Sequence, residues 1–190
     1  MILKISTKNK SCNYWIWNGF KIAWFVENEK DNTPLLLLHG FGANSNHWRN
    51  NIKNFANNGY TVYSMDLLGF GESDQPGIKE IGKLDNGIWC DQVTDFIIDI
   101  IRPINTNKIV IIGNSLGGLV ALTSAVSIPE EISGIIVSPL PDPIGLKINY
   151  SEDKSKQNSY YRQFPWRISS INLCCFHSRR DFWNHCLSIT

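Results

Sequence analysis

Residues 108–118 read KIVIIGNSLGG, and this stretch decides the fold. The apolar run at 108–112 is typical of a buried strand, and the apolar residues over 116–127 favour a helix. Between them lies a glycine-spaced serine, Ser115, which we expect on a tight strand-to-helix turn with a strained backbone and an exposed hydroxyl. Ser115 is therefore the candidate nucleophile. The backbone N–H of Leu116 begins the helix, where negative charge is favoured, so it is a candidate oxyanion-hole donor.

The rest of the chain continues the same alternation of strand and helix. Continuous apolar runs predict buried strands, and apolar residues at helical spacing predict the helices between them. In chain order, the sequence predicts a strand at 34–39, a helix at 48–56, a strand at 61–65, a helix at 93–101, a strand at 108–112, a helix at 116–127 and a strand at 132–137. Before them, runs at 14–17 and 20–26 flank Asn18-Gly19, which is typical of a hairpin turn. The expected fold class is α/β: a mostly parallel sheet with an N-terminal antiparallel hairpin and flanking helices.

A second glycine-rich segment, His39-Gly40-Phe41-Gly42, comes at the end of the first predicted parallel strand. Its glycines let the chain turn at the carboxyl edge of the sheet, where open α/β sheets bind ligands. The backbone N–H of Phe41 is the second candidate oxyanion-hole donor. The glycines do not form a phosphate-binding loop, because Leu119 stands where a P-loop needs lysine. The dinucleotide fingerprint fails too, since its third glycine is replaced by Ser45 or Asp74.

Three motifs in this order, HGFG at 39–42, DLLGFGES at 66–73 and GNSLGG at 113–118, resemble the α/β-hydrolase superfamily over about residues 14–143. Asp91-Gln92-Val93, the GNSLGG motif and the FPW tripeptide at 164–166 are similar to pheophytinase-like hydrolases, which cleave the phytyl ester of chlorophyll derivatives. The resemblance implies an incomplete α/β-hydrolase fold whose lid begins near residue 139. It also implies that Asp66 is a structural acid at a strand end rather than the triad carboxylate.

A serine is a weak nucleophile unless a base takes its proton and an acid orients that base. In this superfamily the acid usually lies in a Gly-x-x-Asp and the base in a Gly-His, and neither pattern follows Gly118. His39 precedes the serine, whereas the family's base comes last, so we interpret His39 as a residue that braces its loop. The histidines after the serine are His177 and His185, and the candidate acids there are Asp142, Asp153 and Asp181.

Two hypotheses therefore stay open. The first is a serine hydrolase acting on an ester through Ser115, with a hydrophobic or phytyl ester implied by the resemblance. The second is a truncated, catalytically inactive remnant that lacks the triad acid and base, with residues past Arg167 read out of frame or cut short. Residues 1–138 are expected to form the N-terminal part of the hydrolase core. Residues 139–190, which are glycine-poor and polar at 149–160, are expected to start a lid and end in an irregular tail.

Composition limits the function further. With 190 residues and 43% hydrophobic content, the chain can bury one core, and its formal net charge of +1 argues against a nucleic-acid partner. No apolar run approaches the roughly 20 residues of a membrane span. The five cysteines form no C-x-x-C pair, which favours reduced thiols in a cytoplasmic protein. No metal-ligand spacing occurs, so we expect no cofactor and a small-molecule ester as the partner.

Overall fold

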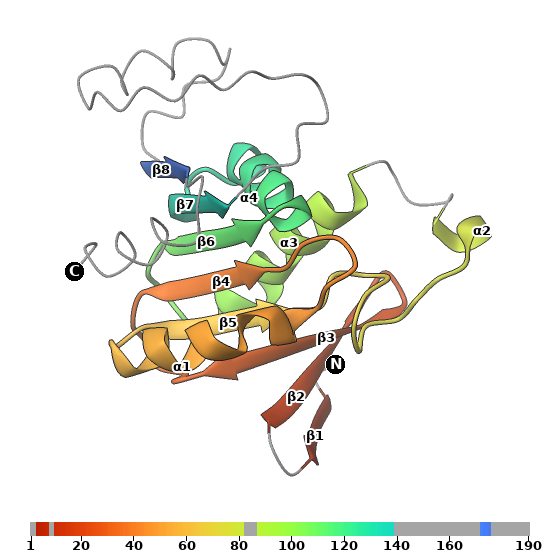
Figure 1. The fold of residues 1–190 in the computed structure, drawn as a ribbon, viewed down its shortest axis with the longest axis horizontal. Coiled ribbons are helices and arrows are strands. Elements are labelled where there is room, and N and C mark those ends of the chain that lie inside the picture. The colour runs from red at the N-terminus through yellow and green to blue at the C-terminus, as the bar shows by residue number, and fades with distance from the viewer. Residues whose placement is uncertain (1–2, 8–9, 82–86, 139–171, 176–190) are drawn as a thin grey trace.

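The computed structural model describes residues 3–7, 10–81, 87–138 and 172–175. It contains a single eight-stranded sheet in the order β1-β2-β3-β5-β4-β6-β7-β8 (Figure 1). The first strands, β1 (Leu3–Thr7), β2 (Lys10–Trp17) and β3 (Phe20–Glu27), run antiparallel to their neighbours. The other five run parallel to one another: β4 (Pro34–Leu38), β5 (Thr61–Met65), β6 (Ile109–Asn114), β7 (Ile132–Ser138) and β8 (Asn172–Cys175). The expected α/β class is confirmed.

The predicted hairpin is present as β2 and β3. Its turn residues Asn18 and Gly19 both have positive φ, 49° and 85°, as a two-residue turn of this hand requires. Aromatic side chains attach the hairpin to the core: the rings of Trp15 and Trp24 lie 5.8 and 5.5 Å from that of Phe96. The hairpin is therefore part of the main core and not a separate arm.

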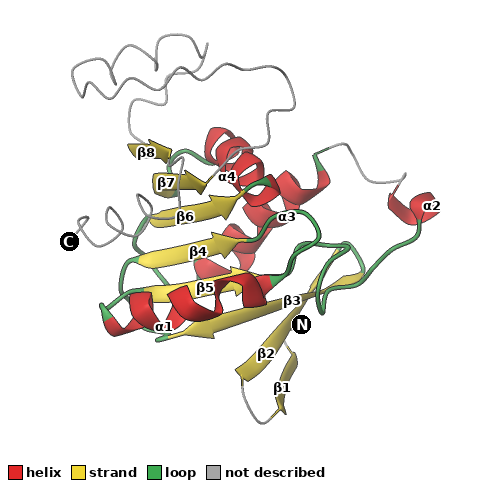
Figure 2. Cartoon of the chain, viewed as in Figure 1, coloured by secondary structure: helices red, strands yellow, loops and turns green. Residues whose placement is uncertain are grey.

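Helices cover both faces of the parallel strands (Figure 2). On one face lie η1 (Ser45–Trp48), a 3₁₀ turn, and α1 (Arg49–Asn57). On the other lie α3 (Ile88–Phe96), its π-helical continuation η2 (Ile97–Ile101), and α4 (Leu116–Ser127), while the short α2 (Ile78–Ile81) stands apart. Because successive strand residues point to opposite faces, Leu35 and Leu37 pack against the α1 layer and Leu36 and Leu38 against the α3–α4 layer. No helix of the described segments is long and apolar enough to span a membrane.

The structure differs from the sequence expectations at a few places. The strand at 61–65 and the helix at 116–127 agree residue for residue, but β6 reaches Asn114 and so leads straight into Ser115. Strand β1, helix α2 and strand β8 were not predicted. The last lies inside the tail expected to be irregular, where it pairs in parallel with β7 from Gly134↔Asn172 to Val137↔Cys175. The expected lid at 139–171 and the tail at 176–190 lie outside the described residues, so the domain boundary at 138 stays a prediction.

Candidate active site

Ser115 lies on the turn between β6 and α4, with φ 52° and ψ −114°. A non-glycine residue in this region of backbone space is strained, and such strain persists only where the surroundings enforce it. Here the neighbouring glycines make the turn possible. A Cβ on Gly113 would overlap the backbone of Gly117 and come within 2.5 Å of the Gly118 nitrogen, and a Cβ on Gly117 would come within 2.6 Å of the His39 carbonyl oxygen.

The backbone around Ser115 is held by hydrogen bonds on both sides. Its N–H donates to the Ser138 carbonyl on β7 at 2.9 Å, and its carbonyl accepts from the N–H groups of Gly118 and Leu119 at 2.9 and 3.2 Å. Ser115 is half-buried, and no hydrogen bond joins its hydroxyl to another described residue. The turn thus presents a hydroxyl that is not hydrogen-bonded within the described chain.

The segment 39–42 lies directly against this turn. Leu38 pairs with Gly113 in the sheet, so the residues after both strands leave the carboxyl edge side by side. A Cβ on Gly40 would lie 3.2 Å from the Ser115 Cβ, so any residue other than glycine at position 40 would require its neighbours to shift. In the part of the chain that the structure describes, the backbone N–H groups of Phe41 and Leu116 donate to no acceptor. The two candidate oxyanion-hole donors therefore belong to the residue after Gly40 and the residue after Ser115, and no acceptor among the described residues engages them.

His39 is completely buried and both its ring nitrogens are engaged. Nδ1 donates to the Gly40 carbonyl at 2.8 Å, and Nε2 accepts from the Leu67 N–H at 3.0 Å. This pair of bonds requires the neutral ring with its proton on Nδ1. Burial lowers the pKa of His39, which further favours the neutral form. The interpretation of His39 as a loop brace is confirmed.

Asp66 is also buried, at the end of β5. Its Oδ1 accepts from the Ser45 N–H at 2.6 Å and its Oδ2 from the Glu72 N–H at 2.8 Å, while the Ser73 hydroxyl donates to its backbone carbonyl at 2.6 Å. Gly71 passes so close to the carboxylate that a Cβ there would collide with it. Asp66 thus connects the loops after β4 and β5 through hydrogen bonds, in agreement with the expectation that it is a structural acid.

The other candidates for proton transfer lie outside the described residues: His177, His185, Asp142, Asp153 and Asp181. The described histidines are His39 and His47, and the described His, Cys, Asp and Glu side chains form no cluster that could hold a metal ion.

The chain matches the alpha/beta hydrolase fold over residues 33–169, most of its length. It belongs to the α/β-hydrolase family. Epoxide hydrolase 4 of Mus musculus is 36% identical to this hydrolase-family chain over 126 residues, which are 66% of the chain and 33% of that protein. The 1-acylglycerol-3-phosphate O-acyltransferase ABHD5 of Homo sapiens is 32% identical over 125 residues, 64% of this chain and 34% of that protein. The chain thus spans about a third of the length of these relatives.

Among solved structures, a thioesterase domain from the curacin biosynthetic pathway superposes with a TM-score of 0.62 at 19% identity, over 80% of this chain and 52% of that one. Epoxide hydrolase A from Mycobacterium thermoresistibile gives a TM-score of 0.60 at 22% identity, over 81% and 44%. Both likenesses show the hydrolase fold.

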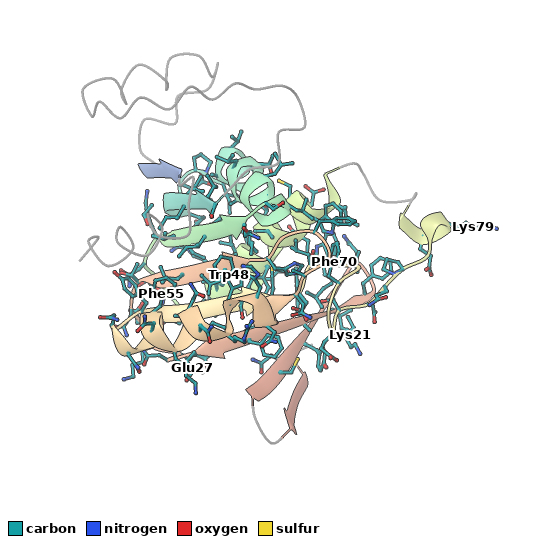
Figure 3. All side chains as sticks on the ribbon, in the orientation of Figure 1. Lys21, Glu27, Trp48, Phe55, Phe70 and Lys79 are labelled. Atoms are coloured by element: carbon teal, nitrogen blue, oxygen red, sulfur yellow. The ribbon has the colours of Figure 1, made fainter. Side chains whose placement is uncertain are left out.

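Sequence reasoning did not identify a clamp that this hydrolase-family chain builds around Leu68, just after β5. The Leu68 N–H donates to Gln92 Oε1 at 3.1 Å, and its carbonyl accepts from Trp89 Nε1 at 2.9 Å. Both clamping side chains come from α3, and Gln92 is completely buried. A signal existed, since Gln92 is a polar residue at the start of the apolar stripe of that helix. The clamp fixes the position of the next aromatic residue, Phe70, at the edge where β4 and β6 end (Figure 3).

Proposed function

We propose that this chain is a serine hydrolase that cleaves a carboxylic ester, with Ser115 as the nucleophile. The observation that carries the proposal is the strained conformation of Ser115, at φ 52°, on the turn that starts α4. Strained nucleophile turns of this kind place a hydroxyl where a substrate carbonyl can approach it. The first turn of α4 adds free N–H groups and a favourable dipole at the same point.

In the proposed reaction, the Ser115 oxygen forms a bond to the acyl carbon while its proton passes to a base. The carbonyl oxygen becomes an oxyanion and accepts hydrogen bonds from the Phe41 and Leu116 N–H groups. Collapse breaks the bond to the alcohol oxygen, which leaves with the proton, and water then hydrolyses the acyl-serine to release the acid. Because both nitrogens of His39 are engaged in bracing its loop, the base in this proposal is His177 or His185.

The serine itself favours an ester over an epoxide, although relatives of this chain are named epoxide hydrolases. An alkoxide that opens an epoxide forms an ether, which water does not hydrolyse under mild conditions, so the enzyme would be consumed after one turnover. A serine that attacks an acyl carbon forms an ester, which water can cleave to regenerate the enzyme. Acyl transfer is therefore the chemistry that a serine at this position can complete.

The finer proposal is that the ester is hydrophobic, with the phytyl ester of a chlorophyll derivative as one member of that class. Its support is the resemblance of Asp91-Gln92-Val93 and residues 113–118 to pheophytinase-like hydrolases. Gln92 has a role in this chain that fits such a motif, because it holds the loop after β5 in place.

The test is steady-state hydrolysis of p-nitrophenyl butyrate by the full chain. We expect Ser115→Ala to lose turnover by at least about a hundredfold. The matched control is Ser127→Ala, which removes a hydroxyl from the last residue of the same helix and is expected to retain the rate. If Ser115→Ala keeps the wild-type rate, the nucleophile assignment is wrong. If the folded wild-type chain gives no turnover, the alternative of a catalytically inactive relative is favoured.

A further inference from the structure

Three aromatic rings contact one another in the loops that follow β4 and β5 and at the start of α3. Phe41 meets Phe70 edge-on, with centroids 5.4 Å apart, and Phe70 is 6.0 Å from Trp89. We call Phe41, Phe70 and Trp89 the aromatic row. Phe41 follows Gly40, the residue that lies against the Ser115 side chain. The row therefore begins at the residue that follows Gly40, whose backbone lies against Ser115.

The row is exposed at one end and anchored at the other. The Phe41 side chain is 76% exposed, so most of its apolar surface is in contact with water. Burial of that surface by a ligand would be favourable. Phe70 and Trp89 are half-buried and pack against the main core. An apolar surface that is exposed at Phe41 and packed against the core at Trp89 is suited to a ligand that covers the Phe41 ring.

Buried hydrogen bonds hold the middle of the row rigid. His39 accepts from the Leu67 N–H, and the side chains from α3 take both backbone groups of Leu68. The Phe70 N–H in turn donates to the Leu67 carbonyl at 2.9 Å. Phe70 is thus positioned before any ligand binds, which reduces the entropic cost of binding.

The loops around the row carry negative charge and no positive charge. Residues 39–45, 66–77 and 113–118, which follow β4, β5 and β6, contain three acidic residues and no lysine or arginine. Asp66 is satisfied by backbone N–H groups, and Asp74 accepts from the Lys21 N–H at 2.7 Å. Glu72 is exposed, and its charge acts on Cys12 and Tyr14 of β2.

Lys21, Arg49 and Lys79, which lie on elements next to these loops, are directed elsewhere. The Lys21 ammonium lies over the Tyr14 ring, 4.8 Å from its centroid, and the Arg49 guanidinium donates to the Asn46 carbonyl. Lys79 stands on α2, well apart from Phe70 (Figure 3). The described edge therefore offers no cation to pair with an anionic substrate.

We propose that the aromatic row binds the uncharged hydrocarbon part of the ester and that an anionic ligand finds no described cation to pair with there. The substrate class is then a neutral ester with an apolar chain, as opposed to a phosphate- or carboxylate-bearing one. This inference rests on the proposed function, since it names the substrate of the Ser115 site.

The test measures binding without turnover, by calorimetric titration of the full-length Ser115→Ala chain. The probes are octanamide, which is neutral and resists hydrolysis, and octanoate, its anionic counterpart. We expect octanamide to bind more tightly than octanoate, and added Phe41→Ala to weaken octanamide about fivefold to tenfold. Phe41 is exposed, so this change should leave folding intact; Phe70→Leu is a second variant expected to weaken the same probe.

The matched control is Val126→Ala, another exposed apolar residue, near the far end of α4, which should leave octanamide binding unchanged. Equal octanamide affinity with and without Phe41, or octanoate binding as tightly as octanamide, would overturn the inference. Row-dependent octanamide binding in a chain that hydrolyses no ester would keep this inference and reject the proposed function.

Discussion

Replacing Gly117 with alanine separates two opposing effects at the Ser115 turn. Alanine is favoured over glycine inside a helix by about 1 kcal/mol, so propensity alone predicts a more stable chain. The added Cβ, however, would collide with the Leu38 carbonyl oxygen and lie 2.6 Å from that of His39. Real Cβ contacts are essentially never closer than 3.0 Å, so α4 and the end of β4 must move apart.

The backbone atoms that block the Cβ cannot rotate away, because β4 is paired on both sides with β5 and β6. Overpacking of this kind costs about 1–3 kcal/mol, and the strain should exceed the gain in helix propensity. After the gain in helix propensity is subtracted, we expect Gly117→Ala to lower the free energy of unfolding by about 1 kcal/mol. Since the two elements carry Ser115 and Gly40, ester hydrolysis should fall as well.

The measurement is urea denaturation followed by circular dichroism. The matched control is Gly87→Ala at the start of α3, where a Cβ would come no closer than 3.9 Å to the Asp91 carboxylate. That control should change the free energy of unfolding by less than about 0.5 kcal/mol. If Gly117→Ala is as stable as the wild-type chain, the close packing of α4 on β4 described above is incorrect.

Three further predictions concern the same edge of the sheet. Asp66→Asn should lower the free energy of unfolding by about 2 kcal/mol in urea denaturation, because an amide has one acceptor oxygen whereas the two carboxylate oxygens each accept from a backbone N–H. An unchanged denaturation midpoint would contradict this role. Burial lowers the pKa of His39 below its ordinary 6.5, so below that pH the unfolded chain binds more protons than the folded chain. The free energy of unfolding should therefore fall on acidification by up to about 1.4 kcal/mol per pH unit. His39→Gln should lack this contribution to the pH dependence. Ser115→Gly should be more stable than Ser115→Ala by about 1 kcal/mol in the same assay, because only glycine relieves the positive φ, and the reverse order would argue against strain.

The parts of the fold that the sequence predicted are those encoded locally. Thr61–Met65 and Leu116–Ser127 agree to the residue because turn and helix-ending residues lie next to them in the sequence: Asn58-Gly59 before the strand, and Gly113 and Pro129 on the two sides of the helix. Ser115 could be identified for a related reason, since the spacing of its glycines encodes the backbone geometry of the turn. The strand at Asn172–Cys175 could not, because it is defined by pairing with β7, more than 30 residues earlier in the chain.

The surroundings of Ser115 depend on contacts between distant residues, and local patterns do not contain them. The hydrogen bond from Leu67 to His39 joins residues 28 apart, and the one from Leu68 to Gln92 joins residues 24 apart. The aromatic row likewise brings together loops after β4 and β5 and the start of α3. A single sequence shows that these side chains exist but not which backbone groups they will meet.

Labelling of the purified chain with a fluorophosphonate probe, followed by peptide mass mapping, tests the role of Ser115 as nucleophile directly. The probe reacts with a serine whose proton is being removed by a base. We expect a label on the peptide that contains Ser115 and its loss in Ser115→Ala. His177→Ala and His185→Ala then identify the base. A folded wild-type chain that stays unlabelled would contradict the proposed nucleophile and leave an α/β-hydrolase relative without hydrolytic activity.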